Sequence, residues 1–224
     1  MIPLKDDNPT DSLPIVTVGL IILNCVIFLY QFTLGESGIS FIYNYGAVPY
    51  LITNPEMAVE GIYFPPEFTI FTSMFLHGGW FHLIGNMLYL WIFGNNIEDK
   101  LGHFTFIVFY ILCGLLASAA HIATAPGSKI PTVGASGAIA GVLGAYLIRF
   151  PKAKVLVLFW FGIFIRTIYV PAVIVLGFWF VLQLFSGLPT LGIEQGGGVA
   201  YFAHIGGFVA GIALFAGLML FKKR

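Results

Sequence analysis

The sequence predicts an all-α polytopic membrane protein, folded as a bundle of six membrane-spanning helices with both termini cytoplasmic. The first observation behind this fold class is composition: 58% of the 224 residues are hydrophobic, 9% are charged, and the mean hydropathy is +0.94. Soluble domains rarely reach such values. The second is length. Because each crossing of a bilayer needs ~20 apolar residues, the chain has room for about six spans once loops are subtracted.

The start of the chain predicts an anchored N-terminus. Residues 1–14 are acidic and contain one lysine, Lys5, so they lack the basic start of a cleavable signal peptide. We expect 1–14 to be a cytoplasmic segment and the apolar run 15–34 to be the first span. The loop at about 35–76 then mixes glutamates with apolar stretches such as "FIYNYGAVPYLI". We expect it on the external side, folded onto or partly into the outer leaflet.

Five further apolar runs complete the predicted six-span domain, 15–221. They cover residues 82–97, 104–124, 136–150, 171–187 and 200–221. The segment at about 151–170 contains β-rich "VLVLF" and "TIYV" together with Arg166, which resists burial in lipid. It is therefore expected to be an interfacial cytoplasmic strand pair. Residues 222–224 form a basic cytoplasmic tail.

The basic residues support this layout, because lysine and arginine are enriched in cytoplasmic loops. With the N-terminus inside, Lys129 falls outside, and the others fall on the cytoplasmic side: Lys5, Lys100, Arg149, Lys152, Lys154, Arg166, Lys222, Lys223 and Arg224. They form no dense basic face, so the sequence gives no support for nucleic-acid binding. Cys25 and Cys113 lie in apolar runs and are expected to be buried thiols.

Polar residues inside spans are costly and therefore mark functional positions. "HGGWFHLIGN" places His82 and Asn86 on one helical face, "GASG" places Ser136 at the start of the fourth span, and "AHIGG" places His204 near the start of the sixth. In the predicted topology these three spans all run from outside to inside. The four polar side chains thus share one depth near the outer face, which indicates a common site.

Small residues explain how the fourth and sixth spans would meet. Gly137, Ala140, Gly141 and Gly144 follow Ser136, and the sixth span carries Gly207 and Gly211. Such small-xxx-small patterns let helix backbones approach closely in lipid. The contact would bring Ser136 within hydrogen-bond reach of His204.

A serine with a histidine base suffices for acyl transfer. The Ser136 backbone N–H at a helix N-terminus, with the side chains of Asn86 and His82, would stabilise the oxyanion. The outer half of the spans contains no Asp or Glu, so an orienting carboxylate is missing. Helix packing would have to hold the ring.

Taken together and in this order, the three motifs resemble the rhomboid family of intramembrane serine proteases. The resemblance covers the chain after residue 14 and implies a rhomboid-like bundle with Ser136 as nucleophile and His204 as general base. It implies an oxyanion hole of His82, Asn86 and the Ser136 backbone N–H. Structural support is expected from His77, Glu98, Gly102, Gly134, Gly137, Gly141, Gly207 and Gly211.

The resemblance further implies a cofactor-independent endopeptidase, embedded in the bilayer, that cleaves single-pass membrane proteins near the outer membrane boundary. Two features depart from many family members. Ala140 occupies the position, four residues after the serine, where an aromatic residue stacks on the histidine, so Tyr201 or a bulkier neighbour would have to orient the ring. Residues 35–76 also lack the Trp-Arg pair that anchors this loop.

Several alternatives are weaker. A zinc protease would need two histidines four apart with a glutamate between them, whereas His77 and His82 are five apart around "GGWF". An aspartyl protease would need paired aspartates in the spans, and the spans contain none. A Ser-Lys dyad is disfavoured because the nearest lysine, Lys129, lies in an expected external turn and not in a span. A transporter would show related halves, and no internal repeat is found. A catalytically inactive relative that binds transmembrane helices remains the main alternative. Without a transit peptide or fused soluble domain, we expect a prokaryotic plasma membrane.

Overall fold

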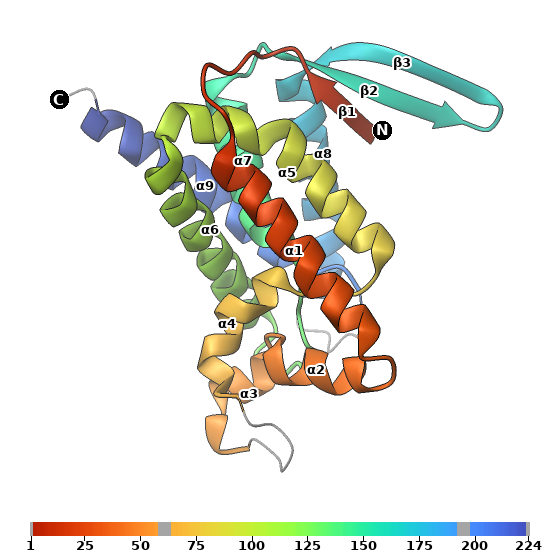
Figure 1. The fold of residues 1–224 in the computed structure, drawn as a ribbon, viewed down its shortest axis with the longest axis vertical. Coiled ribbons are helices and arrows are strands. Elements are labelled where there is room, and N and C mark those ends of the chain that lie inside the picture. The colour runs from red at the N-terminus through yellow and green to blue at the C-terminus, as the bar shows by residue number, and fades with distance from the viewer. Residues whose placement is uncertain (1, 58–63, 192–197, 223–224) are drawn as a thin grey trace.

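The computed structural model of this chain describes residues 2–57, 64–191 and 198–222. Within them, six longer helices form one bundle (Figure 1): α1 (Ile15–Thr33), α5 (Trp80–Leu101), α6 (His103–Thr124), α7 (Ser136–Arg149), α8 (Ala172–Gly187) and α9 (Tyr201–Lys222). Helix α7 is the central one, because every residue from Gly137 to Tyr146 is buried.

The prediction of a helical, multi-pass membrane protein is confirmed. Within the part of the chain that the structure describes, four helices are individually long and apolar enough to cross a membrane, namely α1, α6, α8 with the turn that follows it, and α9. Helix α7 is apolar but has only 14 residues, and α5 carries polar side chains such as His82 and Asn86. The six predicted ranges agree with these helices to within a few residues. Which end faces the cytoplasm stays a prediction.

Close contact between α7 and α9 depends on glycine, as the small residues predict. A Cβ atom at Gly207 would collide with the carbonyl oxygen of Gly137, and one at Gly211 would collide with the carbonyl oxygen of Gly141. On its other side, Gly141 faces Cys113 of α6 at a distance that leaves no room for a Cβ. Backbone therefore lies directly against backbone, and dispersion between the helices is maximal.

A three-stranded antiparallel sheet, in the order β1-β2-β3, lies at one end of the bundle. Strands β2 (Lys154–Phe161) and β3 (Phe164–Pro171) form the predicted strand pair. The sequence did not predict β1 (Ile2–Asp6), which pairs with β2 from Ile2↔Leu158 to Asp6↔Val155. Pro3 is tolerated there because β1 is an edge strand.

The segment between α1 and α5 folds into short helices at the opposite end of the bundle (Figure 1): α2 (Ser37–Tyr45), α3 (Pro49–Thr53) and α4 (Thr69–Thr72), with 3₁₀ turns at Pro55–Met57, Pro66–Phe68 and Ser73–Phe75. It is tied to the loop before α7, since Ala47 pairs with Thr132 and the Tyr50 N–H donates to the Ser128 carbonyl at 2.9 Å. Part of the expected external loop, 58–63, lies outside the described residues.

Glu98, expected to be structural, caps α1. Its fully buried carboxylate accepts the backbone N–H groups of Val16 at 2.9 Å and Thr17 at 2.8 Å, and the His103 ring at 2.6 Å. A carboxylate at a helix N-terminus satisfies N–H groups that have no intrahelical partner. Gly102 adopts φ +82°, which lets α5 turn directly into α6.

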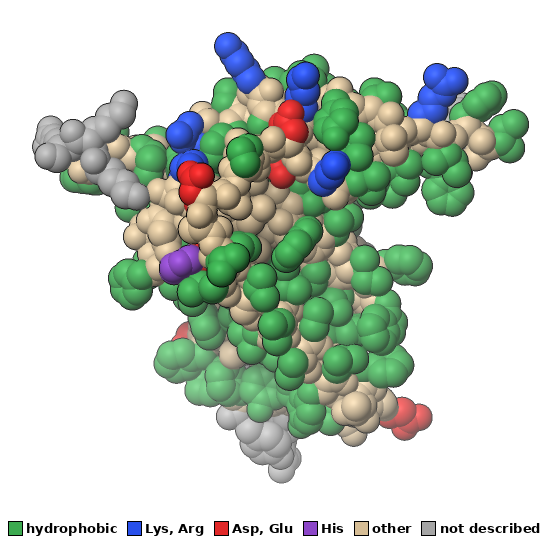
Figure 2. Space-filling model, turned by 45° about the horizontal axis from the view of Figure 1, so that its top comes forward, with side chains coloured by type: hydrophobic (Ala, Val, Ile, Leu, Met, Phe, Trp, Pro, Cys, Tyr) green, Lys and Arg blue, Asp and Glu red, His purple; other side chains and the backbone are tan. Residues whose placement is uncertain are grey.

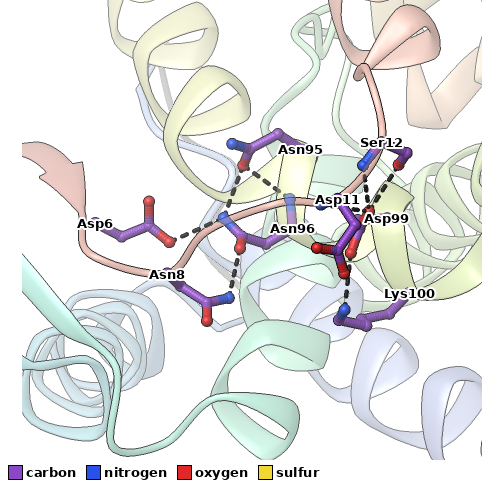
Figure 3. Close-up of polar contacts among 8 residues, drawn as sticks. All are labelled: Asp6, Asn8, Asp11, Ser12, Asn95, Asn96, Asp99 and Lys100. Atoms are coloured by element: carbon purple, nitrogen blue, oxygen red, sulfur yellow. Dashed lines mark hydrogen bonds and ion pairs between the residues drawn. The ribbon is translucent and has the colours of Figure 1, made fainter.

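Hydrogen bonds hold the N-terminal segment against α5 (Figure 3). Asn96 donates to the Asp6 carboxylate at 2.8 Å, and Asn8 donates to the Asn96 side-chain oxygen at 2.5 Å. One turn further along α5, Asp99 accepts the Ser12 hydroxyl at 2.7 Å. These bonds join the sheet to the end of the bundle.

Asp6 also accepts the Tyr146 hydroxyl of α7 at 2.6 Å. Burial of Asp6 raises the pKa of its carboxyl above the ordinary value.

Substituting Gly211 tests the helix contact. We expect Gly211→Ala to destabilise the bundle by about 1–3 kcal/mol through overpacking, lowering the melting temperature in detergent by several degrees. The matched control is Gly217→Ala on the same helix, where an added Cβ meets nothing within 4 Å. Equal melting temperatures for the two variants would contradict the assigned contact.

Asp6→Asn tests the contacts that Asp6 makes with Asn96 and Tyr146. Since the folded protein raises the pKa of Asp6, the folded state holds the proton more tightly, and stability should fall as pH rises through that pKa. An asparagine oxygen still accepts from Tyr146 and Asn96 but does not titrate. We therefore expect Asp6→Asn to reduce the loss of melting temperature between mildly acidic and neutral pH. Glu36→Gln, at an exposed position, is the control and should show the wild-type loss of melting temperature. A wild-type loss in Asp6→Asn as well would show that titration of Asp6 does not affect stability.

Candidate active site

Ser136 and His204 meet across the α7–α9 contact. Ser136 is the first residue of α7, and its Oγ lies 2.8 Å from Nε2 of His204 in the first turn of α9. The packing of Gly207 on Gly137, one residue from the serine, holds the two helix ends together. The structure thus contains the predicted contact between these two side chains.

The tautomer of His204 is set by a residue of α8. Its Nδ1 lies 2.7 Å from Oε1 of Gln183, and an amide oxygen only accepts hydrogen bonds. With that oxygen facing the ring, Nδ1 carries the proton and Nε2 is left as an acceptor for the Ser136 hydroxyl. This is the protonation pattern that a general base needs.

The ring orientation of His204 comes from Trp179, one turn before Gln183. The two rings lie 5.7 Å apart between centroids at an interplanar angle of 35°. A bulky neighbour thus lies beside the ring, although the sequence analysis did not name it, and no ring contact of Tyr201 with His204 occurs among the described residues. The sequence analysis missed both α8 residues, although a single glutamine within an apolar span was the available signal.

His82 and Asn86 line the same cavity from α5. The cavity is about 650 Å³ and is also lined by Ser136 and His204. The Gly78 backbone N–H donates to Nδ1 of His82 across 3.4 Å, which leaves the proton on Nε2. Nδ2 of Asn86 is buried and has no hydrogen-bond partner within the described residues. Both side chains therefore present an unused N–H donor.

The turn before α7 brings its backbone against these donors. Gly134 has φ +126°, and a Cβ there would lie 2.7 Å from Nε2 of His82 and 3.5 Å from Nδ2 of Asn86. Only glycine fits this position. The N–H of Ser136 lies in the first turn of α7, where N–H groups have no intrahelical acceptor. The cavity that Ser136 lines is thus bordered by the N–H donors of His82 and Asn86, beside the N–H of Ser136 itself.

The remaining predicted residues lie outside the cavity wall. His77 is fully buried and packs edge-on against His82, at 5.2 Å between ring centroids, and against Phe28; its structural role stays a prediction. Lys129, the alternative base, has its Nζ 5.0 Å above the ring of Tyr50. Helix α6 also lines the cavity, and its polar lining residues, which the sequence analysis did not select, are Ser118, His121 and Thr124.

Comparison with known proteins matches most of the chain to one family. The family model described as "Rhomboid domain" matches residues 66–222. "Rhomboid protease GluP" of Bacillus subtilis is 32% identical over 154 residues, 68% of this chain and 26% of that protein. "Rhomboid protein 1, mitochondrial" of Saccharomyces cerevisiae is 33% identical over 161 residues, 70% of this chain and 43% of its own. The chain therefore spans less than half the length of these relatives.

Removing the Gln183 oxygen that accepts from His204 Nδ1 tests the α8 contact. We expect Gln183→Leu to slow covalent labelling of Ser136 by a fluorophosphonate about three- to tenfold, because one hydrogen bond that selects the tautomer is lost. Gln183→Glu should retain labelling, since a carboxylate also accepts from Nδ1. Leu182→Ala, at a neighbouring exposed position of α8, is the control. A wild-type labelling rate in Gln183→Leu would show that the glutamine does not position the ring.

Proposed function

Because this chain belongs to the rhomboid family, we propose that it is an intramembrane serine endopeptidase that works by a Ser136–His204 dyad. The observation that carries the proposal is the 2.8 Å contact of the Ser136 hydroxyl with an Nε2 whose ring is held from the other side by Gln183. A serine hydroxyl becomes a useful nucleophile when such a base accepts its proton.

In the proposed reaction, Ser136 Oγ attacks the scissile carbonyl carbon while its proton passes to Nε2 of His204. The carbonyl oxygen becomes an oxyanion, which the N–H groups of His82, Asn86 and Ser136 stabilise. Each such donor contributes about 10²–10³ in rate. The His204 imidazolium then protonates the leaving amine, and an acyl-enzyme remains on Ser136.

Hydrolysis of that ester completes the cycle. Water attacks the acyl carbon as His204 takes its proton, and the same donors stabilise the second oxyanion. The ester bond to Oγ then breaks, and Ser136 recovers its proton from His204. The proposed reaction uses no cofactor.

The proposed substrates are single-pass membrane proteins cleaved near the outer membrane boundary. The site supports this choice because Ser136, His82 and His204 all lie in the first turns of their helices, at one end of the bundle. The cavity also opens between helices of an integral membrane protein. The relatives come from a bacterium and from mitochondria. Location in a prokaryotic plasma membrane stays a prediction.

A fluorophosphonate separates this proposal from a helix-binding function without catalysis. We expect the probe to label the wild type, and labelling to be lost in Ser136→Ala and to fall by at least about a hundredfold in His204→Ala. The same variants should not cleave a model single-span protein in liposomes. Ser40→Ala, an exposed serine of α2, is the matched control and should label normally. A folded wild type that stays unlabelled would favour the binding-only function.

A further inference from the structure

The outer half of the β2–β3 hairpin has no packing partner within the described residues. Strand β1 pairs with β2 only between Val155 and Leu158, and Phe159 still packs against the buried core. Beyond Phe159, β2 and β3 pair only with each other within the described residues. The tip is defined as residues 159–165. It begins at the partly buried Phe159 and is exposed further out: Trp160 is 70% exposed, Ile163 91% and Phe164 68%.

This tip is apolar on both faces. Its sequence, FWFGIFI, contains no charged, amide or hydroxyl side chain, and the Trp160 indole N–H donates to the Gly162 carbonyl at 2.8 Å. A hairpin exposed to water instead alternates polar with apolar residues. An isolated two-stranded hairpin is also marginally stable in water. The tip therefore needs an apolar environment, which the described residues of the chain do not provide.

The position of the hairpin in the fold indicates what this apolar environment is. Strand β3 runs into α8 without a linker, because Pro171 ends the strand and Ala172 begins the helix. Figure 1 shows the hairpin projecting sideways from the bundle at the end where the helices stop, across their direction and not along it. Helix ends of a membrane bundle lie at the bilayer surface, so the hairpin extends along one leaflet.

The charges of the hairpin are of one sign. Arg166 and Lys154 are its charged residues, and neither forms an ion pair within the part of the chain that the structure describes. Figure 2 shows hydrophobic side chains gathered along the projecting element, with basic side chains on the same side of the molecule. Basic residues beside an interfacial apolar surface attract anionic headgroups, and Trp and Tyr favour this depth.

We propose that residues 159–165 insert into the leaflet at this end of the bundle, and that Arg166 binds the phosphate of an anionic phospholipid. The free edge of β3 limits the depth, because its unpaired N–H and C=O groups would be costly in hydrocarbon. The tip thus lies at the boundary of headgroups and acyl chains, as interfacial elements do. The proposal is independent of the proteolytic function.

Site-directed spin labelling of the full chain tests the insertion. In a background with Cys25 and Cys113 replaced, Ile163→Cys carries the label, and Lys152→Cys, exposed at the same end, is the matched control. In phosphatidylcholine–phosphatidylglycerol liposomes, we expect the label at 163 to collide more with oxygen than with a water-soluble nickel chelate, and the label at 152 to show the reverse. Trp160→Cys provides a second label site in the tip.

Two outcomes would overturn the proposal. Equal chelate accessibility at 163 and 152 would place the tip in water, and dipolar broadening between labels at 163 would indicate pairing with a second copy. The headgroup contact has its own readout. Arg166→Gln should lower the preference for phosphatidylglycerol over phosphatidylcholine by up to about fivefold, the effect of one basic residue at the surface, and Arg166→Lys should retain it. An unchanged preference in Arg166→Gln would remove Arg166 from the proposal.

Discussion

The backbone contact between α7 and α9 is the constraint on which the rest of the site depends. Gly207 lies on the Gly137 carbonyl and Gly211 on the Gly141 carbonyl, so the two helices approach more closely than any side chain would allow. Ser136 and His204 stand at the ends of these helices, and the hydrogen bond between them follows from that approach. Packing and the proposed chemistry therefore depend on the same residues. The small residues that let the two helices pack also bring the proposed base, His204, against the proposed nucleophile, Ser136.

The histidine is held by a neutral acceptor. In soluble serine proteases a carboxylate selects the tautomer and stabilises the imidazolium that forms. Here Gln183 accepts from Nδ1 and Trp179 lies against the ring. A buried carboxylate in the outer half of a membrane bundle would be expensive, whereas an amide selects the same tautomer at lower desolvation cost. Gln183 and Trp179 both belong to α8, the helix that follows strand β3 directly.

Much of the fold was predictable because its signals are local. Apolar runs predict the positions of the six longer helices, and β-rich segments around Arg166 predict the hairpin. The Ser136–His204 pairing was also predictable, since both residues share one end of their spans with glycines following each. Strand β1 was not predictable, because "IPLKD" has a weak strand signal and pairs with residues about 150 positions away. Gln183 and Trp179 were missed because their role depends on how α8 rotates against α9, which periodicity in an almost wholly apolar helix does not reveal.

The central claim is that one cavity joins the nucleophile, its base and three oxyanion donors, and the structure of the Ser136 phosphonate adduct tests it most directly. The account predicts a covalent bond from Ser136 Oγ to phosphorus. The phosphoryl oxygen should then lie roughly 2.7–3.1 Å from Nε2 of His82, Nδ2 of Asn86 and the Ser136 backbone N–H. A phosphoryl oxygen directed away from α5, or a probe bound to another residue, would contradict it.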